Sequence, residues 1–293
     1  MTTLLLGANG QLGRHLRDEI DGLVTCARRD ADHLLDLSQF DELEALLERL
    51  RPSVIVNAAA WTAVDDAEDH ENDAFRLNHD LPAALADWCR RREALLVHYS
   101  TDYVFSGRPG RPWRESDPVA PQSVYGRSKL AGEQAIAASA CRALVLRTAW
   151  VYSALPGNFV SAILQRASTG QDLKVVADQV GSPTWAVTLA RASRRLLALS
   201  DRVEGPELLH VSGQGAMSWH QLAETAVQLA AERGIISGMV EIEPIGSDDW
   251  PQKAQRPAWS VLDGSRYAQF TGRPLPDCEQ ALAECLDRWS KVP

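Results

Sequence analysis

The chain contains 293 residues, carries a formal net charge of −9, and is 45% hydrophobic. This length suits one large α/β domain or two coupled lobes, and the acidic balance argues against nucleic acid as a partner, because duplexes are bound through basic patches. No apolar stretch is long enough to cross a bilayer and no basic leader precedes the first apolar run, so we expect a cytoplasmic protein without a membrane partner. The five cysteines lack C-x-x-C spacing, which predicts buried, inert thiols.

The first predicted strand, Leu4 to Leu6, runs directly into a glycine-rich turn. Glycines in such a turn adopt positive φ, let backbone N–H groups approach a pyrophosphate, and allow a helix to pack closely on the strand. The G-x-x-G-x-x-G spacing therefore predicts a dinucleotide site, with an ordinary strand-to-helix turn as the alternative. Its residues are Gly7, Asn9, Gly10, Gln11, Leu12 and Gly13.

The next elements alternate between strand and helix signals up to about residue 150. Apolar runs predict strands at 23–27, 54–56, 95–100 and 143–147, and helical periodicity predicts helices near 43–50, 81–91 and 125–138, the first capped by Ser38. This alternation is typical of a doubly wound parallel sheet of the Rossmann type, formed by residues 1–150. Residues 151–293 are broken by glycine and proline and predict a smaller, interleaved substrate lobe, of which about 175–212 returns to the first domain.

Two segments of the first half predict a catalytic centre. Thr101 and Asp102 stand at the end of the predicted strand 95–100, and Tyr125 and Lys129 are four residues apart on the predicted helix 125–138. A lysine at this spacing shares a helix face with the tyrosine, where its charge would favour the ionised phenol and so lower the pKa of Tyr125. Tyr125 then becomes a candidate acid, and the alternative is an ordinary surface pair.

Blocks in order along nearly the whole chain resemble the extended short-chain dehydrogenase/reductase superfamily and, more closely, the dTDP-4-dehydrorhamnose reductase family. They span 7–13, 57–65, 100–107, 125–133, 147–152, 181–184 and Arg256-Pro257. The resemblance implies reduction of the C4 keto group of the nucleotide sugar dTDP-4-dehydro-L-rhamnose to dTDP-L-rhamnose. The hydride would come from nicotinamide and the proton from Tyr125, with a hydrogen bond from Thr101.

The same resemblance assigns further contacts. It places Lys129 on the nicotinamide ribose and Trp150 against the sugar nucleotide. Asp102 is expected at the substrate or in an Asx turn, and Arg256 at the substrate diphosphate or in solvent. The remaining cofactor contacts would come from Asp36 and Leu37 near the adenine, and from Ala58, Ala59 and Ala60 at the sheet edge.

The residues after the second predicted strand bear on the choice of cofactor. Arg28 and Arg29 stand where NAD-specific folds often place an acidic residue, and guanidinium groups suit a ribose 2′-phosphate. We therefore expect NADPH, with NADH still open because Asp30 and Asp32 are close by.

One departure from the family concerns a metal-dependent dimer. His15 and Val187 replace the residues with which some members hold magnesium at a dimer interface, so we expect no metal site and a monomer or weak homodimer. Two alternatives stay open: a related sugar-nucleotide epimerase or dehydratase, and a non-catalytic regulatory subunit like that of methionine adenosyltransferase. The intact Thr101, Tyr125 and Lys129 favour a reductase.

Overall fold

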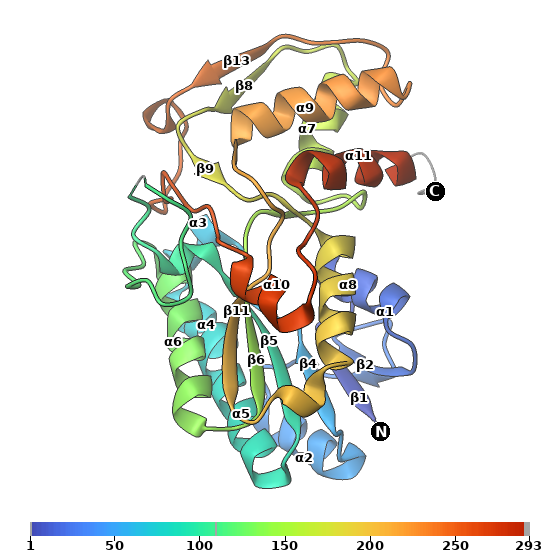
Figure 1. The fold of residues 1–293 in the computed structure, drawn as a ribbon, viewed down its shortest axis with the longest axis vertical. Coiled ribbons are helices and arrows are strands. Elements are labelled where there is room, and N and C mark those ends of the chain that lie inside the picture. Colours follow the sequence, from blue (N-terminus) through green and yellow to red (C-terminus); the bar gives the residue numbers. More distant parts are fainter. Residues whose placement is uncertain (1, 109, 290–293) are drawn as a thin grey trace.

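The computed structural model describes residues 2–108 and 110–289 and is built around a seven-stranded sheet (Figure 1). The strand order is β11-β6-β5-β4-β1-β2-β3, and every neighbouring pair is parallel, which confirms the predicted doubly wound fold. No helix within these described ranges is long and apolar enough to span a membrane. The strands are β1 (Thr3–Leu6), β2 (Leu23–Ala27), β3 (His33–Leu34), β4 (Val54–Asn57), β5 (Leu95–Thr101), β6 (Ala143–Thr148) and β11 (Pro206–His210).

Helices cover both faces of the sheet, because alternate residues of each buried strand point to opposite sides. Leu4 and Leu6 of β1 pack into the core beneath α2, α5 and α6, whereas Leu5 packs into the core shared with α1 and α8. The helices of these layers are α1 (Gln11–Glu19), α2 (Phe40–Leu50), α3 (Val64–Ala67), α4 (Glu71–Phe75), a π-helix at Arg76–Asp80, α5 (Leu81–Arg92), α6 (Val124–Ser139), α8 (Ala186–Leu197) and α10 (Ser265–Thr271).

The start of α2 differs from the prediction. Gln39 precedes the helix, and its side chain makes no capping bond, so the expected Ser38 cap is wrong. The Ser38 N–H instead donates to Asp36 Oδ1 at 3.0 Å in a tight turn before the helix. The local Asx turn competes successfully with the cap, as short polar side chains often do.

The five cysteines are free and buried, as predicted.

A second lobe lies over the carboxyl ends of the strands, at the top of Figure 1, and has its own core. The chain returns from it to the sheet, since β11 pairs with β6 and α8 packs on α1. The lobe consists of α7 (Phe159–Ala167), α9 (Trp219–Glu232), α11 (Cys278–Trp289), and the strand pairs β8 (Leu173–Val176) with β13 (Ile242–Ile245), β7 (Val151–Tyr152) with β10 (Thr184–Trp185), and β9 (Val180–Gly181) with β12 (Met217–Ser218). Short 3₁₀ turns occupy 102–104, 200–202 and 247–249.

Candidate functional site

The glycine turn between β1 and α1 is tightly packed against the strand end of β4. Gly7 has φ +78°, and a Cβ atom there would lie 2.7 Å from the Ala59 nitrogen. A Cβ on Gly13 would lie only 2.2 Å from the Gly7 carbonyl oxygen. The two glycines therefore permit a backbone approach that no other residue allows, and Ala59 forms part of the wall beside the turn.

The amino end of α1 offers free backbone donors to an anion. Gly10 precedes the helix without a side-chain cap, and the first turn contains no acidic residue. Asn9 and Gln11 brace the turn from either side: the Asn9 amide donates to the Arg29 carbonyl, and the Gln11 amide donates to the Val151 carbonyl at 2.8 Å. An uncapped helix N-terminus beside a glycine turn is suited to a pyrophosphate.

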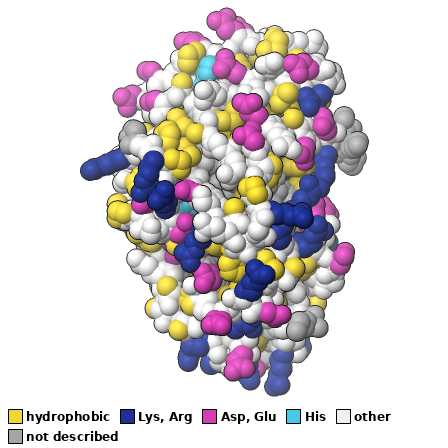
Figure 2. Space-filling model, in the orientation of Figure 1, with side chains coloured by type: hydrophobic (Ala, Val, Ile, Leu, Met, Phe, Trp, Pro, Cys, Tyr) yellow, Lys and Arg dark blue, Asp and Glu magenta, His cyan; other side chains and the backbone are white. Residues whose placement is uncertain are grey.

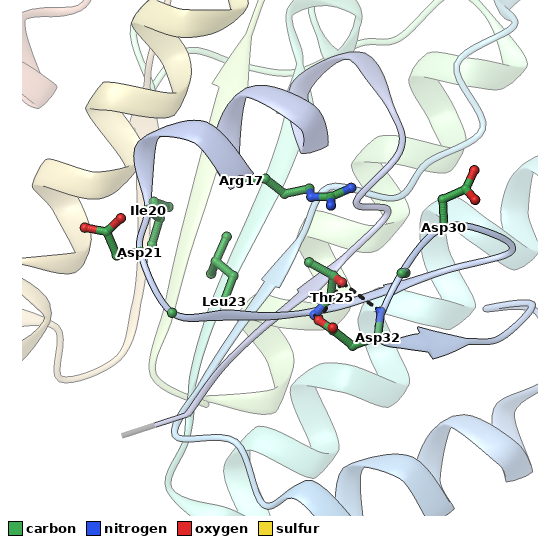
Figure 3. Close-up of a pocket in the computed structure, with 9 residues that line it drawn as sticks. Arg17, Ile20, Asp21, Leu23, Thr25, Asp30 and Asp32 are labelled. Carbon is green, nitrogen blue, oxygen red and sulfur yellow. Dashed lines mark hydrogen bonds between the residues drawn. The ribbon is translucent and has the colours of Figure 1, made fainter.

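The segment after β2 presents Arg28 and Arg29 to solvent. Asp32, in contrast, turns back to Thr25, whose backbone N–H and hydroxyl donate to Asp32 Oδ2 at 2.8 and 2.7 Å (Figure 3). These hydrogen bonds lower the pKa of Asp32. They also direct Oδ2 of this carboxylate back to β2 instead of toward a ribose 2′-hydroxyl. The surface cavity in Figure 3, about 490 Å³, lies beside this segment and contains none of the predicted catalytic residues.

The residues expected near the adenine have mixed environments. Asp36 is exposed, whereas Leu37 is 93% buried and belongs to the core beneath α2 and α5. Ala58 and Ala60 flank Ala59 at the half-buried end of β4. Leu12 is half-buried and packs on the α1–α8 side of the sheet, so its side chain supports the turn.

The catalytic candidates meet at the carboxyl end of β5. Thr101 is the last residue of that strand, and its hydroxyl donates to Asp102 Oδ1 at 3.1 Å while accepting the Tyr103 N–H at 3.2 Å. Tyr125 lies in the first turn of α6, which is capped by Ser123 through the Gly126 N–H. The Tyr125 ring packs edge-on against Tyr103 at 5.6 Å.

The pKa of Tyr125 moves in the direction opposite to that predicted. Burial raises it to about 12, and the nearby Thr101 hydroxyl lowers it only in part. Lys129 does not lower it, because the Lys129 Nζ atom is directed toward β5, donating to the Tyr99 carbonyl at 2.6 Å. Burial also raises the pKa of Asp102 to about 7.

Trp150 cannot offer a free ring face in this structure. A Cβ on Gly181 would lie 2.5 Å from Trp150 Cε2 and 2.8 and 2.9 Å from its bonded neighbours Nε1 and Cζ2. An approach in the plane of the ring would bring those two atoms at least as close as Cε2, so Gly181 lies over one face of the ring. Trp219 stacks on the opposite face, with ring centroids 3.5 Å apart and planes within 2°. Trp150 also has φ +48°, an uncommon backbone conformation for a bulky residue. Only the edge of the Trp150 ring is left for a ligand.

Arg256 reaches the site, but its guanidinium already has two partners. It donates to Asp65 Oδ2 and to Gln252 Oε1, each at 2.8 Å. It also lies near the Tyr103 hydroxyl. Burial raises the pKa of Tyr103, and the Arg256 charge lowers that pKa in part. Tyr103, Trp219 and Asp65 contact the candidate site residues Tyr125, Trp150 and Arg256, and the sequence did not single them out, because each acquires its position through contacts between distant segments.

His15 and Val187 lie on the packed helices α1 and α8. Burial lowers the pKa of His15. Within residues 2–108 and 110–289, no group of three or more potential metal ligands occurs.

On the face drawn in Figure 2, basic and acidic side chains are interspersed.

Comparison with known proteins gives consistent matches. A family model described as the RmlD substrate binding domain matches residues 1–291. A dTDP-4-dehydrorhamnose reductase of Burkholderia thailandensis is 38% identical over 98% of both chains. A probable dTDP-4,6-dihydroxy-2-methyloxan-3-one 4-ketoreductase of Streptomyces antibioticus is 39% identical, covering 98% of this chain and 95% of that one. The crystal structure of a Bacillus anthracis dTDP-4-dehydrorhamnose reductase in complex with NADP has a TM-score of 0.88 at 28% identity, covering 98% and 100% of the two chains.

Proposed function

The chain belongs to the dTDP-4-dehydrorhamnose reductase family, and from this premise we propose that it reduces the C4 keto group of dTDP-4-dehydro-L-rhamnose to dTDP-L-rhamnose with NADPH. The observation that carries the proposal is the meeting of Thr101 and Tyr125 at the carboxyl end of β5, in a chain that matches such a reductase over 98% of its length. A Rossmann sheet binds its ligands at this end of its strands.

Tyr125 is proposed as the proton donor. Its pKa of about 12 keeps the phenol protonated at neutral pH, which is the form a reductase needs. Negative charge that builds on a keto oxygen is more basic than a phenolate, so transfer of the Tyr125 proton is downhill. Tyr125 was chosen because Lys129 was expected to lower its pKa, and that reason is wrong. The raised pKa nevertheless suits its role as an acid.

Thr101 is proposed to orient that phenol. Its hydroxyl proton is directed at Asp102, and one of its oxygen lone pairs accepts the Tyr103 N–H. A second lone pair remains to accept a hydrogen bond from Tyr125 or from a sugar hydroxyl. Asp102 then acts on the reaction through Thr101, while Trp150 contributes a ring edge and Arg256 a guanidinium on the substrate side.

The residues present fit a dinucleotide. Gly7 and Gly13 leave a cradle that a Cβ would fill, and the amino end of α1 presents unpaired N–H groups to a pyrophosphate. Bound NADPH would supply the hydride. Arg28 and Arg29 are free to meet a 2′-phosphate, and Asp32 is held by Thr25, which favours NADPH over NADH. Lys129 is proposed at the ribose, with Asp36, Leu37 and Ala58 to Ala60 around the rest of the cofactor.

The proposal predicts that the purified protein oxidises NADPH in the presence of dTDP-4-dehydro-L-rhamnose. Tyr125→Phe should lower kcat by about 10²-fold or more, because it removes the acid while keeping the ring. Tyr267→Phe is the matched control, since the Tyr267 hydroxyl contacts Arg195 outside the site, 3.2 Å away. Equal activity of the wild type and Tyr125→Phe would exclude the assigned acid.

The substrate is tested in the same assay. The Streptomyces relative is named for a different 4-keto sugar, so a panel of dTDP-4-keto sugars should be compared by kcat/KM. Binding of NADPH without turnover of any of them would support a regulatory subunit, and nicotinamide that stays bound through purification would support an epimerase or dehydratase.

We also propose a monomer or weak homodimer, and a boundary between the two lobes near residue 150.

A further inference from the structure

Lys129 is enclosed by the protein and forms no ion pair with a carboxylate of the residues that the structure describes. Its side chain is 99% buried, and its Nζ atom has two neighbours, the Tyr99 carbonyl at 2.6 Å and His98 Nε2 at 3.2 Å. His98 is fully buried, so its imidazole must satisfy both ring nitrogens within the protein. The pairing of Lys129 with His98 therefore depends on which imidazole nitrogen carries the proton.

Asn57 determines that choice. It is the register partner of His98 in the neighbouring strand β4, and its Nδ2 lies 3.1 Å from His98 Nδ1. Its Oδ1 accepts the N–H of Ala59 at 3.2 Å, which orients the amide. Because Nδ2 is a donor, His98 Nδ1 must accept, and the single proton of the neutral imidazole must reside on Nε2.

The Nε2–H of His98 then points at Lys129. An ammonium group has only donors, so a charged Lys129 would oppose this N–H, whereas a neutral amine has a lone pair that accepts it. Both forms can donate to the Tyr99 carbonyl. The hydrogen-bond pattern of Ala59, Asn57 and His98 is therefore complete only when Lys129 is uncharged.

We propose that Asn57 locks His98 in the tautomer that directs an N–H at Lys129, and that this buried pair favours the neutral amine form of Lys129. Asn57 and His98 are thus positioning residues for a lysine that the proposed function places at the cofactor, and their consequence for turnover rests on that proposed function. The protonation of Lys129 itself can be measured on the free protein, independently of any activity.

The other charged and titratable groups around Lys129 do not account for this preference. On α6, Glu133 lies one turn beyond Lys129 and favours its charged form, but both Glu133 oxygens accept hydrogen bonds from Arg147 of β6, at 2.9 and 2.6 Å. Tyr125 lies one turn before it with a protonated phenol. Desolvation also favours the neutral amine and lowers the pKa of Lys129 to about 8. Burial, together with the nearby Lys129, holds the pKa of His98 well below its usual value.

Nuclear magnetic resonance can test the proposal directly, because the chain has only four lysines, Lys129, Lys174, Lys253 and Lys291, and seven histidines. A pH titration of protein labelled with ¹⁵N at lysine Nζ should show Lys129 losing its proton at least about one pH unit below the exposed Lys174. Its signal is identified as the one missing from Lys129→Met. In ¹⁵N-histidine spectra, His98 should be protonated at Nε2 and unprotonated at Nδ1.

Asn57→Asp provides the decisive variant. One oxygen of the introduced carboxylate can still accept the Ala59 N–H, while the other now requires a proton on His98 Nδ1, so Nε2 becomes an acceptor for a charged Lys129. We expect the His98 tautomer to reverse and Lys129 to titrate about one pH unit or more higher than in the wild type. The added charge alone would also raise this value, so Asn57→Asp is repeated in a His98→Gln background, where the tautomer effect is absent and most of the increase should disappear.

Three results would overturn the proposal: a wild-type His98 protonated at Nδ1, a Lys129 that titrates like Lys174, or an equal Asn57→Asp effect with and without His98. The first two need no variant, so they remain decisive if a substitution prevents folding. A protein that passes these tests but does not oxidise NADPH would retain the lysine mechanism and lose the proposed function.

Discussion

At the scale of single residues, the buried carboxyl of Asp102 makes the stability of the folded protein depend on pH. Its carboxyl is 98% buried, one oxygen accepts the Thr101 hydroxyl, and the hydroxyls of Ser260 and Thr101 offset the loss of solvent only in part. Burial raises its pKa from 3.8 to about 7. Between these values the folded protein binds a proton that the unfolded chain does not, so the contribution of Asp102 to stability decreases as pH rises.

We therefore predict that Asp102→Asn flattens this pH dependence. Relative to the wild type, the variant should gain stability as pH rises from about 4 to 7, by up to roughly 4 kcal/mol. Urea unfolding at a series of pH values measures the effect. Asp117→Asn is the control: Arg111 lowers the pKa of Asp117 to about 2, so its contribution is complete above the ordinary value of 3.8 and is lost only as pH falls toward 2. If the wild type and Asp102→Asn have parallel curves between pH 4 and 7, Asp102 is ionised in the folded state across that range.

At the scale of elements, the junction of β1 and α1 combines stability with cofactor binding. Gly13 is inside α1, where alanine is normally the better helix former. The 2.2 Å approach to the Gly7 oxygen reverses that preference, because a methyl group there must displace backbone atoms. Gly13→Ala should thus destabilise the protein by about 1–3 kcal/mol and weaken NADPH binding at least about tenfold.

Gly205→Ala is the matched control for this prediction, since nothing lies within 4 Å of a Cβ at Gly205. It should leave the midpoint of unfolding and the NADPH dissociation constant essentially unchanged. Thermal unfolding and fluorescence titration with NADPH measure both quantities. Normal NADPH affinity in a folded Gly13→Ala protein would mean that the dinucleotide does not lie over this turn.

The elements that the sequence predicted correctly are those specified by local pattern. Apolar runs located β1, β2, β4, β5 and β6 but not the two-residue strand β3, and the Tyr125 and Lys129 spacing placed both residues on α6 because a helix preserves such spacing. The surroundings of these residues could not be predicted. The stack of Trp150 on Trp219, the register of Asn57 with His98 and the burial that raises the pKa of Tyr125 arise from tertiary packing, which has no short-range signature.

At the scale of the whole molecule, the segment 253–263 connects the second lobe to the sheet domain. Trp113 exchanges two backbone hydrogen bonds with it, through the Val261 carbonyl and the Asp263 N–H, both at 2.8 Å. Asp65, in α3, accepts the N–H groups of Lys253 and Ala254 at 3.1 and 3.0 Å. These contacts hold in place the segment that presents Arg256.

Removal of the Asp65 carboxylate should therefore loosen the segment 253–263. Asp65→Ala leaves two backbone donors and the Arg256 guanidinium without their acceptor, so we predict faster hydrogen exchange across 252–258 and a loss of about 1–3 kcal/mol in stability. It should also raise the KM for the sugar nucleotide more than it lowers kcat, because Arg256 loses its fixed position while Tyr125 and Thr101 do not. Asp69→Ala removes only an exposed ion pair with Lys253 and should change stability by less than about 1 kcal/mol. Exchange rates that respond equally to both substitutions would show that surface charge, rather than the Asp65 hydrogen bonds, holds the two lobes together.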